Sequence, residues 1–186
     1  MIKKISITIL LFVCLVCRLQ GQEQIAIKTN LLHDLTTTLN LGVELSVASD
    51  WTVDLSIDYN PWTFSGNKKF KHWLLQPEVR YWTDRGFQGH FFGAHLLAGG
   101  FNMGGIRLLG VKNERRQGYM YGIGLGYGYR WLFNTHWGME AEVGLGYIYN
   151  VYDRYPCGVC GERLGEGHKN YLGPTRVALS LIYRIR

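Results

Sequence analysis

Hydrophobic and polar residues alternate with a period of two along most of the chain after residue 22. The clearest example runs from Tyr119 to Phe133, where the odd positions are apolar or aromatic and the even positions are mostly glycine. Alternation of this kind places successive side chains on opposite faces of a β-strand. The pattern therefore predicts strands with one bulky apolar face and one face that is small or polar.

Eight segments of the chain show this alternation, and short stretches rich in turn residues separate them. The segments are approximately 25–32, 39–47, 51–59, 73–81, 90–101, 119–133, 137–151 and 176–185. The first and fifth are less regular, and in the fifth we expect His95 on the polar face.

Charged residues share a strand face with the glycines, and the bulky apolar residues occupy the other face. This distribution is the reverse of the one expected for a soluble β-barrel or sandwich. In a soluble barrel the bulky apolar side chains fill the interior, whereas a barrel in lipid turns them outward and keeps a polar lumen. The apolar rows also have Tyr and Trp at their ends, as expected for interfacial girdles. Asp58 and Arg184 lie on the charged face. The predicted lumen charge network consists of Glu44, Asp54, Glu78, Arg80, Arg130, Glu140, Glu142 and Arg176.

We therefore predict an all-β fold, an eight-stranded antiparallel up-and-down transmembrane β-barrel that occupies residues 22–186. Eight strands close into a small barrel that side chains nearly fill, and closure leaves no backbone edge unpaired in hydrocarbon. Connections at one end are short (48–50, 84–88 and 134–136) and those at the other are mostly long (34–38, 61–72, 102–117 and 153–170). Short periplasmic turns and long external loops are typical of outer-membrane barrels. A soluble β-barrel is the alternative.

Residues 1–21 are predicted to form a cleaved secretory signal peptide. Lys3 and Lys4 precede an apolar run over residues 5–17, and small and polar residues follow it. This run is shorter than the roughly 20 apolar residues of a transmembrane helix. A lipoprotein signal at Cys14 or Cys17 is an alternative. We expect export through this segment and localisation in the outer membrane.

The composition agrees with this interpretation. The chain of 186 residues is 47% hydrophobic, 18% charged and 14% aromatic, with 24 glycines, so a disordered chain is excluded and a helical protein is disfavoured. Without residues 1–21, which contain three basic and no acidic residues, the formal net charge falls from +6 to +3. A charge this small, with no cluster of basic residues, predicts no binding to nucleic acid.

Several stretches of the sequence resemble a known kind of protein. They are 26–32 with 41–44, 58–64 leading to 72–82, and 157–161 with 167–171 and 173–175. The architecture is similar to the OmpA-type eight-stranded barrel. These stretches resemble, more specifically, small outer-membrane proteins of unknown function from Gram-negative anaerobes. Members of that group are often encoded beside fimbria-assembly proteins, so the resemblance implies a surface-assembly association and no established activity.

Cys157 and Cys160 form the sharpest local motif of the chain. An exported compartment favours their oxidation to a disulfide, which would shape the external loop. Two alternatives are half of a zinc site completed by His168 and a partner, and free or redox-active thiols.

Glu140 and Glu142 lie two positions apart and hence on one strand face, as paired catalytic carboxylates would. Ion pairs with Arg130, Arg176 or Arg80 in the lumen are the favoured interpretation. None of the histidines forms a His-x-Ser pair on an apolar face, which disfavours a lipid-modifying enzyme. We predict no catalytic residue, no cofactor and no metal site.

The sequence favours a non-enzymatic outer-membrane β-barrel protein whose external loops serve a surface or fimbria-related interaction. The expected partners are outer-membrane lipid and a fimbrial or cell-envelope protein, and the loop over 153–170 is the expected binding element. The alternatives are a lipid-modifying outer-membrane enzyme and a narrow solute pore.

Overall fold

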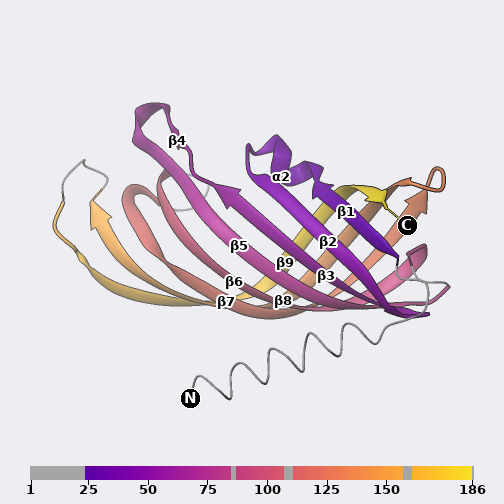
Figure 1. Cartoon of the computed structure of the whole chain (residues 1–186). Coiled ribbons are helices and arrows are strands. Elements are labelled where there is room, and N and C mark those ends of the chain that lie inside the picture. The colour runs from indigo at the N-terminus through magenta and orange to yellow at the C-terminus, as the bar shows by residue number, and fades with distance from the viewer. Residues whose placement is uncertain (1–23, 85–86, 107–110, 157–160, 186) are drawn as a thin grey trace, which may run out of the picture.

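The computed structural model describes residues 24–84, 87–106, 111–156 and 161–185, and Figure 1 shows that strands make up most of them. Leu31–Leu35 forms the short helix α2, and Ser65–Asn67 forms a 3-10 turn, η1. The strands are β1 (Ile25–Asn30), β2 (Leu39–Ala48), β3 (Trp51–Asn60), β4 (Thr63–Phe64), β5 (Lys68–Trp82), β6 (Gly89–Ile106), β7 (Val111–Leu132), β8 (Trp137–Pro156) and β9 (Gly165–Arg184).

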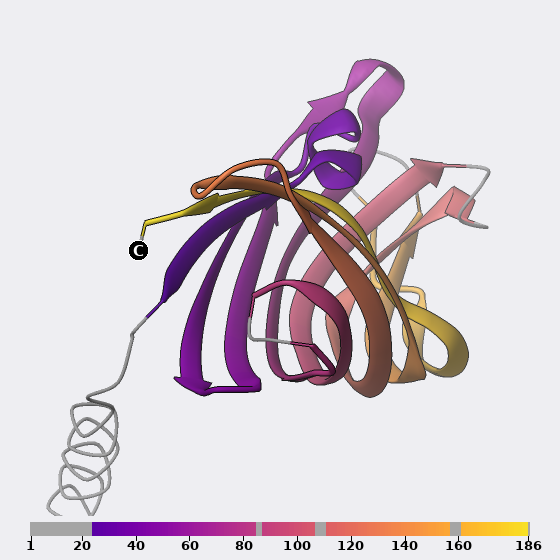
Figure 2. The same cartoon turned by 90° about the vertical axis from the view of Figure 1, so that its right-hand side faces the viewer.

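Eight long strands close into a ring. They are hydrogen-bonded in the order β3-β2-β1-β9-β8-β7-β6-β5, and β3 pairs with β5 to complete the circle. All of these pairings are antiparallel. Figure 2 shows the strands curving around a common interior. The prediction of an all-β antiparallel barrel is confirmed, and the ninth strand, β4, is a two-residue addition that pairs with β5.

The register between β7 and β8 shows why the glycines of the two strands coincide. Leu125 pairs with Leu145, and the glycines on either side of Leu125 pair with Gly144 and Gly146. The two leucines point outward and are 71% and 61% exposed. Glycines then face the interior on both strands, where larger side chains from other strands occupy the space. A Cβ atom at Gly124, for example, would lie 2.5 Å from His95 Nε2.

Strands extend much further than predicted at the end of the barrel that carries α2. In Figure 1, β5 to β9 reach well beyond the end of β1 and β2 on this side. The expected loops over 102–117 and 153–170 are largely strand, because β6 and β7 pair as far as Ile106 with Val111, and β8 and β9 as far as Arg154 with Gly165. Beyond the barrel most residues of these hairpins are at least partly exposed on both faces, so the hydrophobic alternation that marks a strand disappears.

The first connection at the same end contains α2, which the alternation pattern did not predict. Asn30 caps this helix, because its Oδ1 accepts a hydrogen bond from the backbone N–H of Leu32 over 3.2 Å. Its five residues are too few to give a helical hydrophobic period. A side-chain cap of this kind is the local signal that marks such a helix.

Candidate functional site

The interior of the barrel contains a set of buried charged side chains. Those of Glu44, Arg80 and Arg130 are 0% exposed. The structure places the whole predicted lumen set inside the barrel, with exposures of 8% or less. These residues are Glu44, Asp54, Glu78, Arg80, Arg130, Glu140, Glu142 and Arg176.

Arg80 on β5 lies at the centre of this lumen charge network. Its Nε donates to Glu78 Oε2 and its Nη2 donates to Glu142 Oε2, each over 2.7 Å. Its Nη1 lies 3.1 Å from Glu44 Oε2 and 3.0 Å from Glu140 Oε1. Neither β2 nor β8 is a neighbour of β5 in the sheet, so this guanidinium joins strands across the lumen. A planar group with five donors suits contacts with several carboxylates.

Two further arginines complete the cross-connections. Arg176 on β9 donates from Nε to Glu142 Oε2 and from Nη2 to Asp54 Oδ1, both over 2.9 Å. Arg130 on β7 donates to the same two glutamates, on β2 and β8, that Arg80 Nη1 contacts. Glu140 and Glu142, the neighbouring carboxylates on β8, therefore each bind arginines from other strands, as an ion-pair network requires.

Lys28 is a member of the network that sequence reasoning missed. Its Nζ lies 2.8 Å from Asp54 Oδ2 and 3.2 Å from Glu44 Oε2, and the residue is 4% exposed. Gly42 on the neighbouring strand leaves room for it, since a Cβ there would lie 2.7 Å from Lys28 Cγ. The alternation of apolar and polar residues from Ile25 to Asn30 was the available signal, because it places Lys28 on the polar face.

Aromatic side chains close the interior at the end with the short turns. Trp82, Phe87 and Phe91 are each 1% exposed or less, and the rings of Trp82 and Phe91 are 4.8 Å apart. Arg80 lies 4.4 Å from the ring centre of Phe91, and Arg130 lies 4.7 Å from that of Trp82. Cation–π contacts of this kind connect the charged network directly to the apolar closure.

The opposite end of the barrel is open and polar. A cavity of about 670 Å³ lies there, and its lining includes Asn60, His72, Phe101, Gln117, Tyr152 and Asp153. The hairpin formed by β8 and β9 extends from this end, and Arg163 beside it donates to Asp153 over 2.9 Å and to Glu166 over 2.5 Å. These hydrogen bonds raise the pKa of Arg163 above its ordinary value. Cys157 and Cys160, predicted to form a disulfide, lie outside the described residues, as does the predicted signal peptide over residues 1–21.

The family described as "Protein of unknown function (DUF3575)" matches residues 7–185 of the chain. The chain belongs to this family. The match spans the whole barrel, so the lumen network and the hairpin extensions all lie within the family region. No curated protein and no solved structure matches the chain.

The remaining observations on this DUF3575 chain concern membrane-spanning helices and two further buried polar residues. In the part of the chain that the structure describes, no helix has the length and apolar character needed to cross a membrane. His95, predicted on the polar face of its strand, is 1% exposed and lies in the interior. Asp58 is also buried, and its Oδ1 lies 2.7 Å from His33 Nδ1 near the open end.

Proposed function

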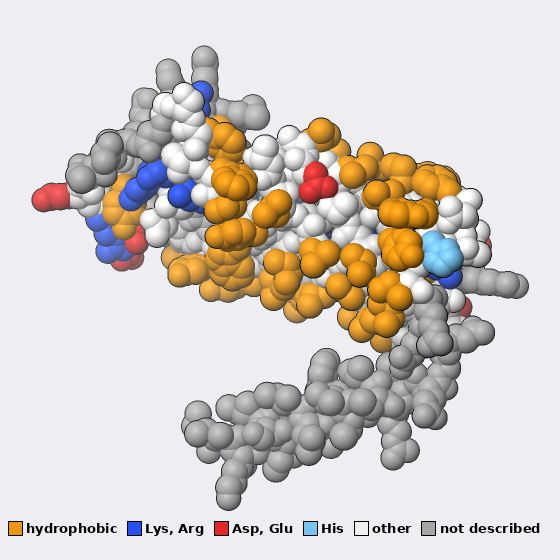
Figure 3. All heavy atoms as spheres, turned by 45° about the horizontal axis from the view of Figure 1, so that its top comes forward, with side chains coloured by type: hydrophobic (Ala, Val, Ile, Leu, Met, Phe, Trp, Pro, Cys, Tyr) orange, Lys and Arg blue, Asp and Glu red, His pale blue; other side chains and the backbone are white. Residues whose placement is uncertain are grey.

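We propose that this protein is an outer-membrane β-barrel that acts as a non-enzymatic binding protein at the cell surface. The observation that carries the proposal is the distribution of side chains, which is inverted relative to a soluble protein. Charged residues such as Glu44 and Arg80 are 0% exposed, whereas Leu41, Ile57 and Val143 are 56%, 49% and 57% exposed. A continuous apolar outer wall of this kind suits lipid. In Figure 3, hydrophobic side chains form bands along the barrel wall on the face shown, with other side chains and backbone between them, and Lys and Arg gather at the left end.

Aromatic pairs border this wall on both sides, as interfacial girdles do. Trp51 pairs with Tyr81 near the short turns, and Tyr59 pairs with Trp73 near the open end of the same two strands. Aliphatic residues lie between these pairs. On β7, ten residue steps separate Tyr121 from Trp131, which is about 34 Å along a strand. A tilt of about 40° reduces this to about 26 Å, close to the apolar height of roughly 25 Å in such barrels.

In this orientation the long hairpins lie outside the cell, and they are the candidate surface for a fimbrial or cell-envelope protein. The extended hairpins of β6–β7 and β8–β9 present backbone and polar side chains beyond the apolar wall. The contacts of Arg163 with Asp153 and Glu166 support a defined arrangement of the chain beside the described ends of β8 and β9. A preformed binding element lowers the ordering cost of binding.

The lumen network disfavours the alternative of a narrow solute pore. Arg80 contacts carboxylates on β5, β8 and β2, so charged side chains cross the interior where an open path would run. A lipid-modifying enzyme remains the other alternative, and release of fatty acid from extracted lipids by the purified barrel would favour it.

Fractionation and labelling test the proposal. The protein should sediment with the outer membrane and resist alkaline extraction. In a Cys157→Ser/Cys160→Ser background, Arg163→Cys should react with an impermeant maleimide in intact cells. Thr135→Cys, in the turn between β7 and β8, should react only after permeabilisation. Recovery in the soluble periplasm, or the opposite labelling pattern, would overturn the proposal.

A further inference from the structure

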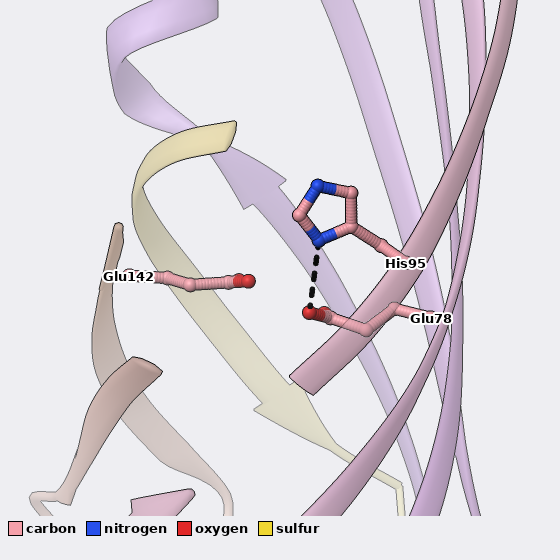
Figure 4. A group of neighbouring side chains, drawn as sticks. All are labelled: Glu78, His95 and Glu142. Atoms are coloured by element: carbon pink, nitrogen blue, oxygen red, sulfur yellow. Dashed lines mark ion pairs between the residues drawn. The ribbon is translucent and has the colours of Figure 1, made fainter. Parts of the chain in front are cut away.

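Three ligand atoms from separate strands converge in the lumen beside Arg80. They belong to Glu78 on β5, His95 on β6 and Glu142 on β8, and all lie within 4.8 Å of one another. His95 Nδ1 lies 3.7 Å from Glu78 Oε1. Figure 4 shows the Glu142 side chain extending from the other side of the lumen toward this pair.

Each carboxylate in the group has one oxygen bound to arginine and one oxygen free. Oε2 of Glu78 accepts from Arg80, and Oε2 of Glu142 accepts from both Arg80 and Arg176. Among the described residues, Oε1 of each glutamate and Nδ1 of His95 have no hydrogen-bond partner. The three residues are 1%, 2% and 1% exposed, respectively, and unpaired buried polar atoms are costly. Three such atoms facing one point indicate a site for a ligand.

The remaining contacts orient His95 toward the two carboxylates and leave space between the three side chains. His95 Nε2 lies 2.8 Å from Thr175 Oγ1, so the hydroxyl can accept the Nε2–H and leave the Nδ1 lone pair directed at the carboxylates. Metal-binding histidines commonly have an outer partner of this kind. Gly126 keeps the space open, because a Cβ there would lie 3.0 Å from Glu142 Oε1 and 3.3 Å from Glu78 Oε1.

The charges facing the site favour a cation. The lumen network contains five carboxylates and four basic side chains, so with His95 neutral its net charge is −1. The carboxylates belong to Glu44, Asp54, Glu78, Glu140 and Glu142, and the cations to Lys28, Arg80, Arg130 and Arg176. An anion or a neutral solute would not relieve this imbalance.

We propose that Glu78 Oε1, His95 Nδ1 and Glu142 Oε1 bind one divalent transition-metal ion, with Zn²⁺ as the representative. An imidazole with two carboxylates suits zinc and its neighbours better than Mg²⁺ or Ca²⁺, which prefer oxygen ligands alone. Zinc–ligand distances of about 2.1 Å place tetrahedral ligand atoms about 3.4 Å apart. The widest separation here therefore closes by rotation of the glutamate side chains.

A small polar cavity lies beside the proposed site. It has a volume of about 70 Å³, and Ser56, Gln76, Thr175 and Arg176 line it. Thr175 contacts His95 and Arg176 contacts Glu142, so the cavity borders the site. Protons compete with metal for these ligands, so affinity should fall as the pH is lowered. The proposal depends only on the barrel interior and not on the proposed surface function.

Calorimetric titration of the purified, folded barrel with Zn²⁺ tests the site. A Cys157→Ser/Cys160→Ser background removes the thiols, which would also bind zinc. One ion per chain should bind at neutral pH, and excess Mg²⁺ should not displace it. His95→Ala and Glu142→Gln should each weaken binding at least about 100-fold. Thr175→Val, which removes only the outer partner, should weaken it about 10- to 100-fold.

His90→Ala is the matched control, because His90 lies on the same strand but outside the interior and should leave Zn²⁺ affinity unchanged. Circular dichroism and the gel shift on heating should verify that every variant is folded. A folded barrel that binds no Zn²⁺ would overturn the proposal. Binding that persists in folded His95→Ala and Glu142→Gln, or that is lost in folded His90→Ala, would do the same.

Discussion

Arg80 donates to Glu142 Oε2 over 2.7 Å although their strands, β5 and β8, are not neighbours in the sheet. This contact holds opposite walls of the barrel at a fixed separation. Both side chains are at most 2% exposed, so neither charge has bulk water as an alternative partner. Removing one partner of a buried pair leaves the other charge uncompensated, which is much more costly than replacing the whole pair.

Arg80→Met should therefore destabilise the barrel by about 3–5 kcal/mol. Its carboxylate partners on three strands would lose their shared cation. Urea unfolding of the barrel in lipid vesicles, followed by tryptophan fluorescence, measures the change. Arg116→Met is the control, because Arg116 lies beyond the network and is paired with Glu114 at partly exposed positions. Similar losses in the two variants would contradict the central role of Arg80.

The direction of side chains on β7 gives a second prediction. Leu125→Arg places a charge on the apolar outer wall and should cost about 2–4 kcal/mol if this wall lies in lipid. Gly126→Ser points inward, toward carboxylate oxygens that can shift, and should be milder. Leu164→Arg is a matched control at a leucine that is 60% exposed beyond the strands. Insertion into vesicles should fail only for Leu125→Arg, and equal insertion of all three would argue against a lipid-facing wall.

The strand faces could be predicted from sequence because their signal is local. A strict period of two is sufficient to separate Leu125 from its glycine neighbours and to turn Glu140 and Glu142 inward. The single Lys28 in the short first strand gave too weak a pattern to be included in the network. Beyond the apolar wall the alternation of apolar and polar residues ends, so the sequence predicts loops where the structure has long hairpins.

The convergence of Glu78, His95 and Glu142 could not be predicted in the same way. Sequence placed each of them on a polar face, but their proximity depends on how eight strands close and on the stagger between them. Glu78 pairs with His95 in the register of β5 and β6, whereas Glu142 reaches them from across the lumen. Long-range geometry of this kind is set by strand tilt and closure, which no single segment encodes.

Close packing at Gly124 gives a third prediction. A Cβ at this position would lie 2.5 Å from both His95 Nε2 and Thr175 Oγ1, so Gly124→Ala should push these two groups apart. Overpacking of this kind costs about 1–3 kcal/mol. Gly126→Ala meets its nearest atom at 3.0 Å and should cost less. Thermal unfolding of both variants in detergent measures the difference, and a larger loss for Gly126→Ala would contradict the packing described here.

The ion pairs of Arg163 beside the β8–β9 hairpin give the last prediction, which concerns the proposed partner. Arg163→Ala removes the contacts with Asp153 and Glu166, and Cys157→Ser/Cys160→Ser removes the predicted disulfide. The stability of the barrel should be nearly unchanged in either variant, because exposed ion pairs contribute little and a disulfide that closes so short a loop adds little. Ordering a looser hairpin on binding should nevertheless weaken partner capture about two- to tenfold.

A photo-crosslinking residue at Glu162 in intact cells, followed by identification of the crosslinked fimbrial or envelope protein, measures this capture. Thr135→Ala, in the turn at the other end of the barrel, is the control and should leave the yield unchanged. If the yield is the same in Arg163→Ala, in the double cysteine variant and in the control, the shape of the hairpin does not determine binding. The surface function would then need another element, and the rim cavity lined by Asn60 and His72 would be the next to test.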